Sequence, residues 1–177
     1  MSTLRKAGLA IGGFMLIAVA SHAIAKGKTD ETMKALVPGV QAWSNGSNVV
    51  SAVSAANTAN AGLTKVQVRD LGRQWHDGLS GKESAILSQI NGNALSQDLK
   101  TIQADSHGAY KGIVVTDQKG LIVGETYNAP HYSLSSQGIW RKIKKDGVSA
   151  AYYGKTALGL PVVSDDKVVG AVLVTTK

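Results

Sequence analysis

The sequence of 177 residues contains no cysteine. Its absence excludes disulfides, thiolate metal sites, iron–sulfur clusters, a cysteine nucleophile and a lipid anchor attached to cysteine. Proline is scarce, with three residues, and aromatic residues make up 5% of the chain. Outside the N-terminal region, no apolar run reaches the roughly 20 residues that cross a bilayer, which excludes a polytopic membrane protein. Whatever the protein does, it does without sulfur chemistry.

The residues that are present suit one globular domain. Hydrophobic residues make up 44% of the chain and charged residues 18%, with 20 glycines. This balance lies far from the composition of disordered chains, and a domain commonly takes about 150 residues. We therefore expect a single domain, over residues 26–177, after an N-terminal leader.

The leader, residues 1–25, has the three parts of a secretory signal peptide. Two basic residues precede an apolar stretch over residues 7–20, and Ala23 and Ala25 place small side chains where a signal peptidase reads. We predict cleavage after Ala25 and a periplasmic or secreted mature chain, whose formal charge falls from +7 to +5 with the loss of the two basic residues. The alternative is an uncleaved anchor, because this segment is long enough to cross a thin membrane.

The first half of the mature chain carries helical patterns. Apolar and small residues recur at helical spacing over 33–60, which predicts one long amphipathic helix with Pro38 and Gly39 as the place for a break or for its true start. Three further helices are predicted by their N-terminal signals. These signals are the capping boxes Thr64 with Gln67 and Ser80 with Glu83, and the cap residue Asn93.

After about residue 108 the pattern changes to that of strands. β-branched runs flank the turn sequences 117–120 and 164–167, and each turn predicts a hairpin. Between the hairpins, residues 135–145 predict a short helix. Strands behind a helical half indicate an α+β fold with a five-stranded antiparallel sheet. The predicted strands are 113–116, 121–125, 149–154, 158–163 and 168–174.

An ordered series of short patterns runs from about residue 41 to residue 177. Its members are Trp43, 49–53 (VVSAV), Asn57, Asn60, 71–75 (LGRQW), 112–125 (GIVVTDQKGLIVGE), Tyr132 with Ser133, 137–140 (QGIW), 160–163 (LPVV) and 167–172 (KVVGAV). This series resembles the Cache superfamily and, within it, the PDC-type sensor domains, which are extracytoplasmic relatives of PAS domains. The resemblance implies a PAS-like five-stranded antiparallel sheet with a long N-terminal helix and short flanking helices. It also implies a small-ligand pocket over the sheet.

Three positions depart from the pattern of Cache domains that bind amino acids. Gly138 stands two residues before the tryptophan where arginine is usual, Arg141 follows it where tyrosine is usual, and His131 replaces an aspartate. The resemblance therefore does not transfer the identity of the ligand. Cache domains usually lie between two membrane spans and feed an output module. The expectation for this chain is a stand-alone domain whose signal passes through a separate membrane partner.

Aromatic residues concentrate between Tyr127 and Tyr153, which hold five of the eight aromatics beyond the leader. Aromatic walls with a few hydrogen-bonding groups are the usual make-up of a small-molecule pocket. The alternative is that Trp140 is a core residue and the tyrosines lie on strand surfaces. The predicted ligand-binding residues are Tyr127, Tyr132, Ser133, Trp140, Arg141, Tyr152 and Lys155.

Residues 140–145 (WRKIKK) contain four cations. Such a run can attract an anionic ligand, a lipid head group or a nucleic acid. A solvated helix face, whose positive charge suits the C-terminal end of the helix, is the simpler interpretation. A secreted location gives no reason to expect nucleic-acid binding.

No pattern in the chain indicates catalysis. His76, His107 and His131 are isolated, without the spacing that would place two imidazoles on one metal, and no GxSxG sequence is present. We therefore expect neither an enzyme nor a cofactor. The leading hypothesis is a sensor domain that presents a small molecule, in one version an anionic one, to a membrane signalling protein. The alternatives are an envelope structural or assembly protein with an occluded pocket and, third, a small hydrolase.

Overall fold

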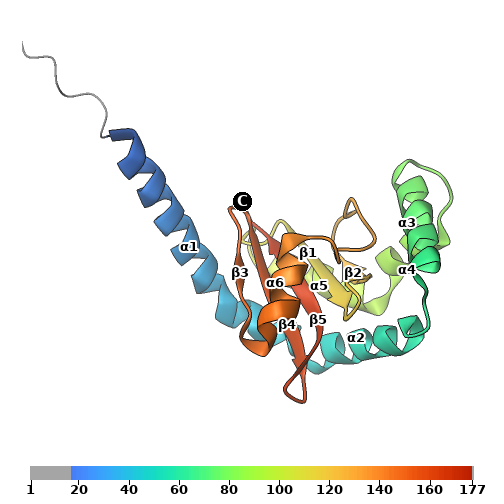
Figure 1. Cartoon of the computed structure of the whole chain (residues 1–177). Helices are drawn as coiled ribbons and strands as arrows, with labels where there is room; N and C mark the ends of the chain where they lie inside the picture. The colour runs from blue at the N-terminus through green and yellow to red at the C-terminus, as the bar shows by residue number, and fades with distance from the viewer. Residues whose placement is uncertain (1–16, 177) are drawn as a thin grey trace, which may run out of the picture.

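The computed structural model describes residues 17–176, with side chains from residue 31 onward. In this part of the chain, six α-helices accompany one five-stranded antiparallel sheet, which confirms the predicted α+β class (Figure 1). The predicted leader falls partly outside the described residues, and the side chains around its cleavage site lie outside them. Within the described range, no helix combines the length and apolar character needed to cross a membrane.

Five helices precede the sheet, and the sixth interrupts it. They are α1 (Ile17–Ser44), α2 (Ser47–Asn60), α3 (Lys65–Leu79), α4 (Ala85–Gly92), α5 (Ala94–Asp105) and α6 (Gly138–Asp146). The strands are β1 (Gly112–Asp117), β2 (Ile122–Glu125), β3 (Tyr152–Tyr153), β4 (Ala157–Ser164) and β5 (Lys167–Thr175). Their order across the sheet is β2-β1-β5-β4-β3.

The single helix predicted over 33–60 is two helices. Pro38 lies inside α1 without ending it, and the chain instead breaks at residues 45–46. Gly46 is extended and is the N-cap of α2, while the Asn45 side chain accepts a hydrogen bond from the backbone N–H of Val163 (2.9 Å). The break therefore joins the helices to β4, a contact that the helical periodicity of the sequence does not show.

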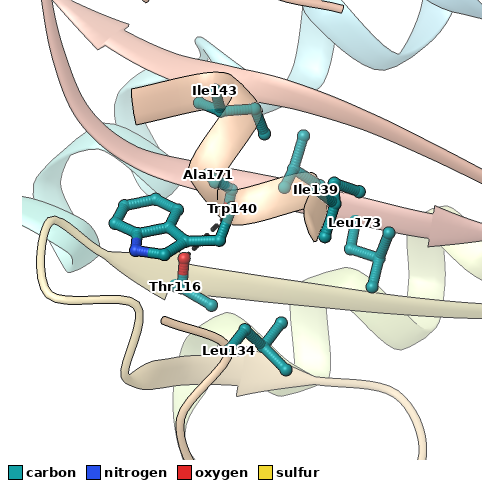
Figure 2. A pocket seen from close by; sticks show the side chains of 8 residues that line it. Thr116, Leu134, Ile139, Trp140, Ile143, Ala171 and Leu173 are labelled. Atoms are coloured by element: carbon teal, nitrogen blue, oxygen red, sulfur yellow. Dashed lines mark hydrogen bonds between the residues drawn. The ribbon is translucent and has the colours of Figure 1, made fainter. Parts of the chain in front are cut away.

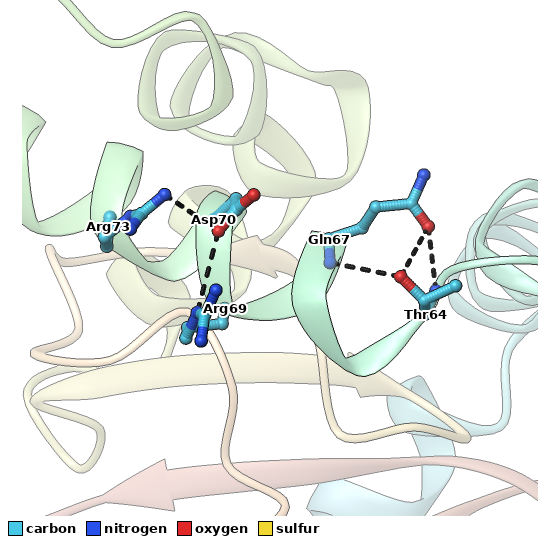
Figure 3. Close-up of polar contacts among 5 residues, drawn as sticks. All are labelled: Thr64, Gln67, Arg69, Asp70 and Arg73. Atoms are coloured by element: carbon cyan, nitrogen blue, oxygen red, sulfur yellow. Dashed lines mark hydrogen bonds and ion pairs between the residues drawn. The ribbon is translucent and has the colours of Figure 1, made fainter.

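The predicted helix starts at Thr64 and Asn93 are confirmed, and the one at Ser80 is wrong. Thr64 and Gln67 form the complete capping box of α3 (Figure 3), and Asn93 caps α5 by accepting from the backbone N–H of Ser96. Ser80 instead ends α3, with its hydroxyl donating to the carbonyl of His76. The cap of α4 is Ser84, four residues later.

The two faces of the sheet carry different covers, because alternate residues of each strand point to opposite sides. One face packs against α1, α2 and α5 in the largest buried cluster, where Val53 and Leu99 meet Val115 and Val172. The other face carries α6 over β4 and β5. A segment after β2 packs on the same side of β1 and β2, in a buried cluster that Trp75 of α3 joins. The candidate binding surfaces all lie on this second side.

Helix α6 lies directly on β4 because residue 159 is glycine. A Cβ atom at Gly159 would overlap the side chain of Ile139, which is on the first turn of α6. The apolar side of α6, with Ile139, Trp140 and Ile143, is buried against the sheet. The close approach leaves little volume between them.

The β1–β2 turn is tied to the end of α2. The Asp117 side chain is buried and accepts the backbone N–H groups of Lys119 (2.8 Å) and Leu121 (2.9 Å) and the Nδ2 of Asn60 (2.8 Å). Lys119 Nζ donates to the carbonyls of residues 60, 61 and 63, at 2.7, 2.8 and 3.2 Å. These bonds fix the position of the loop between α2 and α3 relative to the sheet.

Candidate functional site

The space between α6 and the sheet is almost filled. Its lining includes Thr116, Leu134, Trp140 and Leu173, and the cavity that remains measures about 10 Å³ (Figure 2). A volume of this size holds about one water molecule. A small-molecule ligand therefore does not fit between α6 and the sheet in this conformation.

A larger hollow, which we call the α3 groove, lies between α3 and the segment 130–136. It measures about 470 Å³ and opens to solvent, a volume within the range of small-molecule sites. The lining residues on α3 are Lys65, Val68, Arg69, Gly72 and His76, and those on the facing segment are Pro130, His131, Tyr132, Ser133, Ser135 and Ser136.

Trp75 holds the two walls of the α3 groove together. This α3 residue is fully buried, and its Nε1 donates to the carbonyl of Ala129 (2.8 Å). Its ring also lies 5.6 Å from that of Tyr132, centroid to centroid, in a tilted arrangement. On α3, Lys65, Arg69, Gly72 and His76 recur at intervals of four, three and four residues, so they share one side of the helix, which the capping box at Thr64 starts.

Tyr132 presents a hydroxyl group that has no partner among the residues that the structure describes. The residue is 4% exposed, and its hydroxyl makes no hydrogen bond to another described residue, yet it is not among the side-chain atoms sealed from solvent. Burial, assisted by the charge of Asp117, raises the pKa of Tyr132 to about 12. The hydroxyl therefore stays protonated at neutral pH and can donate.

The charged groups of the α3 groove are all basic. Lys65 and Arg69 line it together with the imidazoles of His76 and His131, and no carboxylate is among its lining residues. Two acids lie on the same helix. Asp77 pairs with Lys82 at 2.8 Å, and the Oδ1 of Asp70 lies 2.9 Å from Arg73 Nη2 and 3.7 Å from Arg69 Nε (Figure 3). All of these side chains are well exposed, so the pairs are weak.

A second hollow of about 400 Å³ lies beyond the edge of Trp140. Its lining residues are Gln118, Lys119, Trp140, Lys144 and Val168. Lys119 is already committed here, because its Nζ donates to three carbonyls at the end of α2. The hollow therefore offers one uncommitted cation, Lys144.

The structure does not bring the seven predicted ligand-binding residues together. Tyr132 and Ser133 line the α3 groove, whereas Trp140 lines the second hollow and the small cavity under α6. Tyr127 packs its ring over Gly112, where a Cβ would overlap it, and Tyr152 packs beside the buried residues of α6. Arg141 and Lys155 are exposed and line none of these three hollows.

Sequence reasoning missed the α3 wall of the groove. From the sequence, Lys65 and Arg69 are expected only as parts of a helix, and His76 and His131 only as isolated imidazoles. The spacing of Lys65, Arg69 and His76 in the sequence shows that these three residues share one side of a helix. That this side faces residues 130–136 depends on packing across some 60 positions, which no local pattern encodes.

Sequence reasoning also missed Glu125, a fully buried carboxyl group at the end of β2. Its Oε2 accepts the backbone N–H of Ala129 (2.9 Å), while Oε1 has no hydrogen-bond partner in the described part of the chain. Burial raises the pKa of this carboxyl to about 7, against the opposing effects of the Ala129 bond and the Lys100 charge. The side chain fixes the first turn of the segment that continues into the groove wall.

Comparison with known proteins adds no relative. No protein-family model matches the chain, and no curated protein matches it at a significant level. The resemblance to PDC-type Cache domains stays a prediction from the sequence.

Proposed function

We propose that the protein is a non-enzymatic, small-molecule-binding sensor domain of the periplasm or the extracellular space, which signals through a separate membrane protein. The observation that carries the proposal is the α3 groove. Its volume of about 470 Å³ suits a small ligand, and its wall combines an aromatic ring, hydroxyl groups, imidazoles and cations. The antiparallel sheet with helices on both faces is compatible with a PAS-like fold, as the sequence resemblance implies.

We place the ligand in the α3 groove and not beneath α6. The groove has room for a ligand, whereas the space under α6 holds about 10 Å³. Tyr132 supports this placement, because a nearly buried hydroxyl that bonds no described residue is available to a ligand. A bound molecule would contact α3 on one side and the segment after β2 on the other.

Gly72 allows a direct test of the groove. A Cβ at this position meets nothing within 4 Å, so Gly72→Phe fills the groove without a clash at the backbone. We expect native mass spectrometry of protein purified from its own host to show a bound small molecule in the wild type, and its loss in Gly72→Phe. The matched control is Gly92→Phe, at an equally open glycine that does not line the groove. A wild-type protein without a bound molecule, or equal retention by both variants, contradicts the proposal.

Tyr132→Phe separates binding from stability. The substitution keeps the ring that packs on Trp75 and removes a hydroxyl that bonds no described residue. We expect an affinity about tenfold lower, since one hydrogen bond is worth about 1 kcal/mol or slightly more. Calorimetric titration with the co-purified molecule, beside thermal melts, measures both. Unchanged affinity would place the ligand away from Tyr132.

Export is part of the proposal and has its own test. Cleavage after Ala25 gives a mature chain that begins at Lys26. N-terminal sequencing of the protein from envelope fractions should return this residue. A sequence that begins before residue 20 supports the membrane-anchored alternative.

The filled space under α6 favours one alternative, an envelope structural or assembly protein that uses the fold for protein contacts. In that case no small molecule binds in the α3 groove. A gene that encodes Gly72→Phe would then complement loss of the wild-type gene. If the protein is a sensor, the variant with the blocked groove would not respond to the ligand and would fail to complement.

A further inference from the structure

We propose that the α3 groove selects an anionic ligand, one whose phosphate or carboxylate group is held by Lys65 and Arg69 and by the hydroxyl of Tyr132. The inference rests on the proposed function, because it names the class of molecule that the groove binds. It goes beyond that function by predicting which charge the ligand carries and which side chains recognise it.

The charge of the side chains that line the groove is the first argument for an anionic ligand. The four titratable groups of the groove besides Tyr132 are two cations and two imidazoles, and no acidic side chain is among its lining residues. The two acids of α3, Asp70 and Asp77, make their short ion pairs with Arg73 and Lys82. Lys65 forms no ion pair with another residue that the structure describes. A hollow with basic groups alone attracts anions and repels cations.

The guanidinium group of Arg69 has free donors, which is the second argument. Among the described residues its one acidic contact is Asp70, and the 3.7 Å between Nε and Oδ1 is too long for a hydrogen bond. Asp70 makes its shorter contact with Arg73, at 2.9 Å. The donors of the Arg69 guanidinium therefore remain available, and their planar arrangement matches the two oxygens of a carboxylate or phosphate.

The opposite wall supplies neutral donors. The Tyr132 hydroxyl is nearly buried, has no partner among the described residues and keeps its proton at neutral pH. Ser133 and Ser135 lie beside it, with their hydroxyl oxygens 2.9 Å apart. An anion between the walls would receive charge-assisted bonds from α3 and hydroxyl bonds from the facing segment, which is how proteins satisfy a partly desolvated anion.

The cations of α6 are the competing site, and they are less suited. Lys142 is paired with Asp146 at 2.6 Å, and Arg141 is exposed and lines none of the three hollows. Among the residues that the structure describes, the hollow beside them offers one free cation, Lys144, because the Nζ of Lys119 already donates to three carbonyls. The α3 groove therefore combines more free donors with a defined shape.

The test is a nuclear magnetic resonance titration of the ¹⁵N-labelled domain with inorganic phosphate and, separately, with succinate, at ionic strength held constant by chloride. We expect saturable shifts of the backbone amides over residues 65–76 and 131–136. The double variant Lys65→Gln/Arg69→Gln should bind at least about tenfold more weakly, because it removes two charge-assisted contacts. The matched control, Lys142→Gln/Lys155→Gln, makes the same change in net charge away from the groove.

The two probes distinguish the group that the groove reads, since a phosphate site responds to phosphate more strongly and a carboxylate site to succinate. Shifts that do not saturate, that fall on residues 141–145, or that weaken equally in both double variants would overturn the inference. The spectra also report whether each variant is folded. A neutral co-purified molecule that Gly72→Phe displaces would refute the anionic class and leave the proposed function standing. If Lys65→Gln/Arg69→Gln still binds the anions and Gly72→Phe still retains the co-purified molecule, both the inference and the proposed function are refuted.

Discussion

Replacing Glu125 with glutamine should make the protein progressively more stable, relative to the wild type, as the pH rises from 5 to 8. The wild-type carboxyl is fully buried with one oxygen unpartnered, so ionisation places an uncompensated charge in the interior. Glutamine keeps the shape and still offers an oxygen to the backbone N–H of Ala129, and it carries no charge. The variant thus imitates the protonated acid at every pH.

The size and sign of the effect follow from the pKa of Glu125, which burial raises from 4.5 to about 7. The folded protein holds this proton more tightly than the unfolded chain does, so the contribution of the group to stability is complete below pH 4.5 and is lost as the pH rises toward 7. Over that range the free energy of unfolding falls by about 1.4 kcal/mol per pH unit, or about 3 kcal/mol altogether. For a domain of this length, such a difference is about 6–12 °C in Tm.

Urea unfolding of both proteins at pH 5, 6, 7 and 8 measures the difference directly. Asp77 and Asp146 also affect the pH profile, because hydrogen bonds from Lys82 and Lys142 lower the pKa of these two exposed carboxyls. Both groups are present in the wild type and in the variant, so their effects cancel in the difference. The amide of glutamine can add a constant offset of about 1–3 kcal/mol. The reasoning is refuted if the advantage of the variant does not grow by at least about 1 kcal/mol between pH 5 and pH 8.

Four further substitutions probe other parts of the fold by chemical denaturation. Lys119→Met should cost about 1–3 kcal/mol, because three carbonyls at the end of α2 lose their donor; an unchanged midpoint would show that water replaces it freely. Gly159→Ala should cost about 1–3 kcal/mol through overlap with Ile139, whereas Gly72→Ala, at an open helical position, should stabilise by up to about 1 kcal/mol. If both glycine variants shift stability in one direction, the close approach of α6 is not what constrains residue 159. Thr64→Ala should cost about 1 kcal/mol, and a loss below about 0.3 kcal/mol would mean that the capping box contributes little.

Features that depend on neighbouring residues could be predicted from the sequence, and features that depend on distant ones could not. The cap at Thr64 is a local bond to a residue three positions away, and its pattern is readable. Ser80 shows the same pattern but fails, since Gly81 adopts a left-handed conformation (φ 85°) that ends the helix there. The break at residues 45–46 depends on the bond between Asn45 and Val163, which are 118 positions apart.

The candidate site shows the same division. Tyr132 and Ser133 stood out because aromatic residues concentrate in their region. The opposite wall escaped notice because Lys65, Arg69 and His76 meet it only through the packing of Trp75 against Ala129 and Tyr132. Glu125 gave no signal, since nothing near it in the sequence shows that a carboxyl ending a strand is buried.

The position of β5 has a consequence for how the molecule is made. Residues 167–175 form a central strand, hydrogen-bonded to β1 on one side and to β4 on the other. While the chain is being synthesised, the β1–β2 hairpin has nothing to pair with along its inner edge until these late residues emerge. Pairing across so many intervening positions is slow, because the ends of a long loop must meet before any contact rewards them. The sheet therefore cannot close before residues 167–175 have been synthesised, and until then the inner edge of β1 stays unpaired.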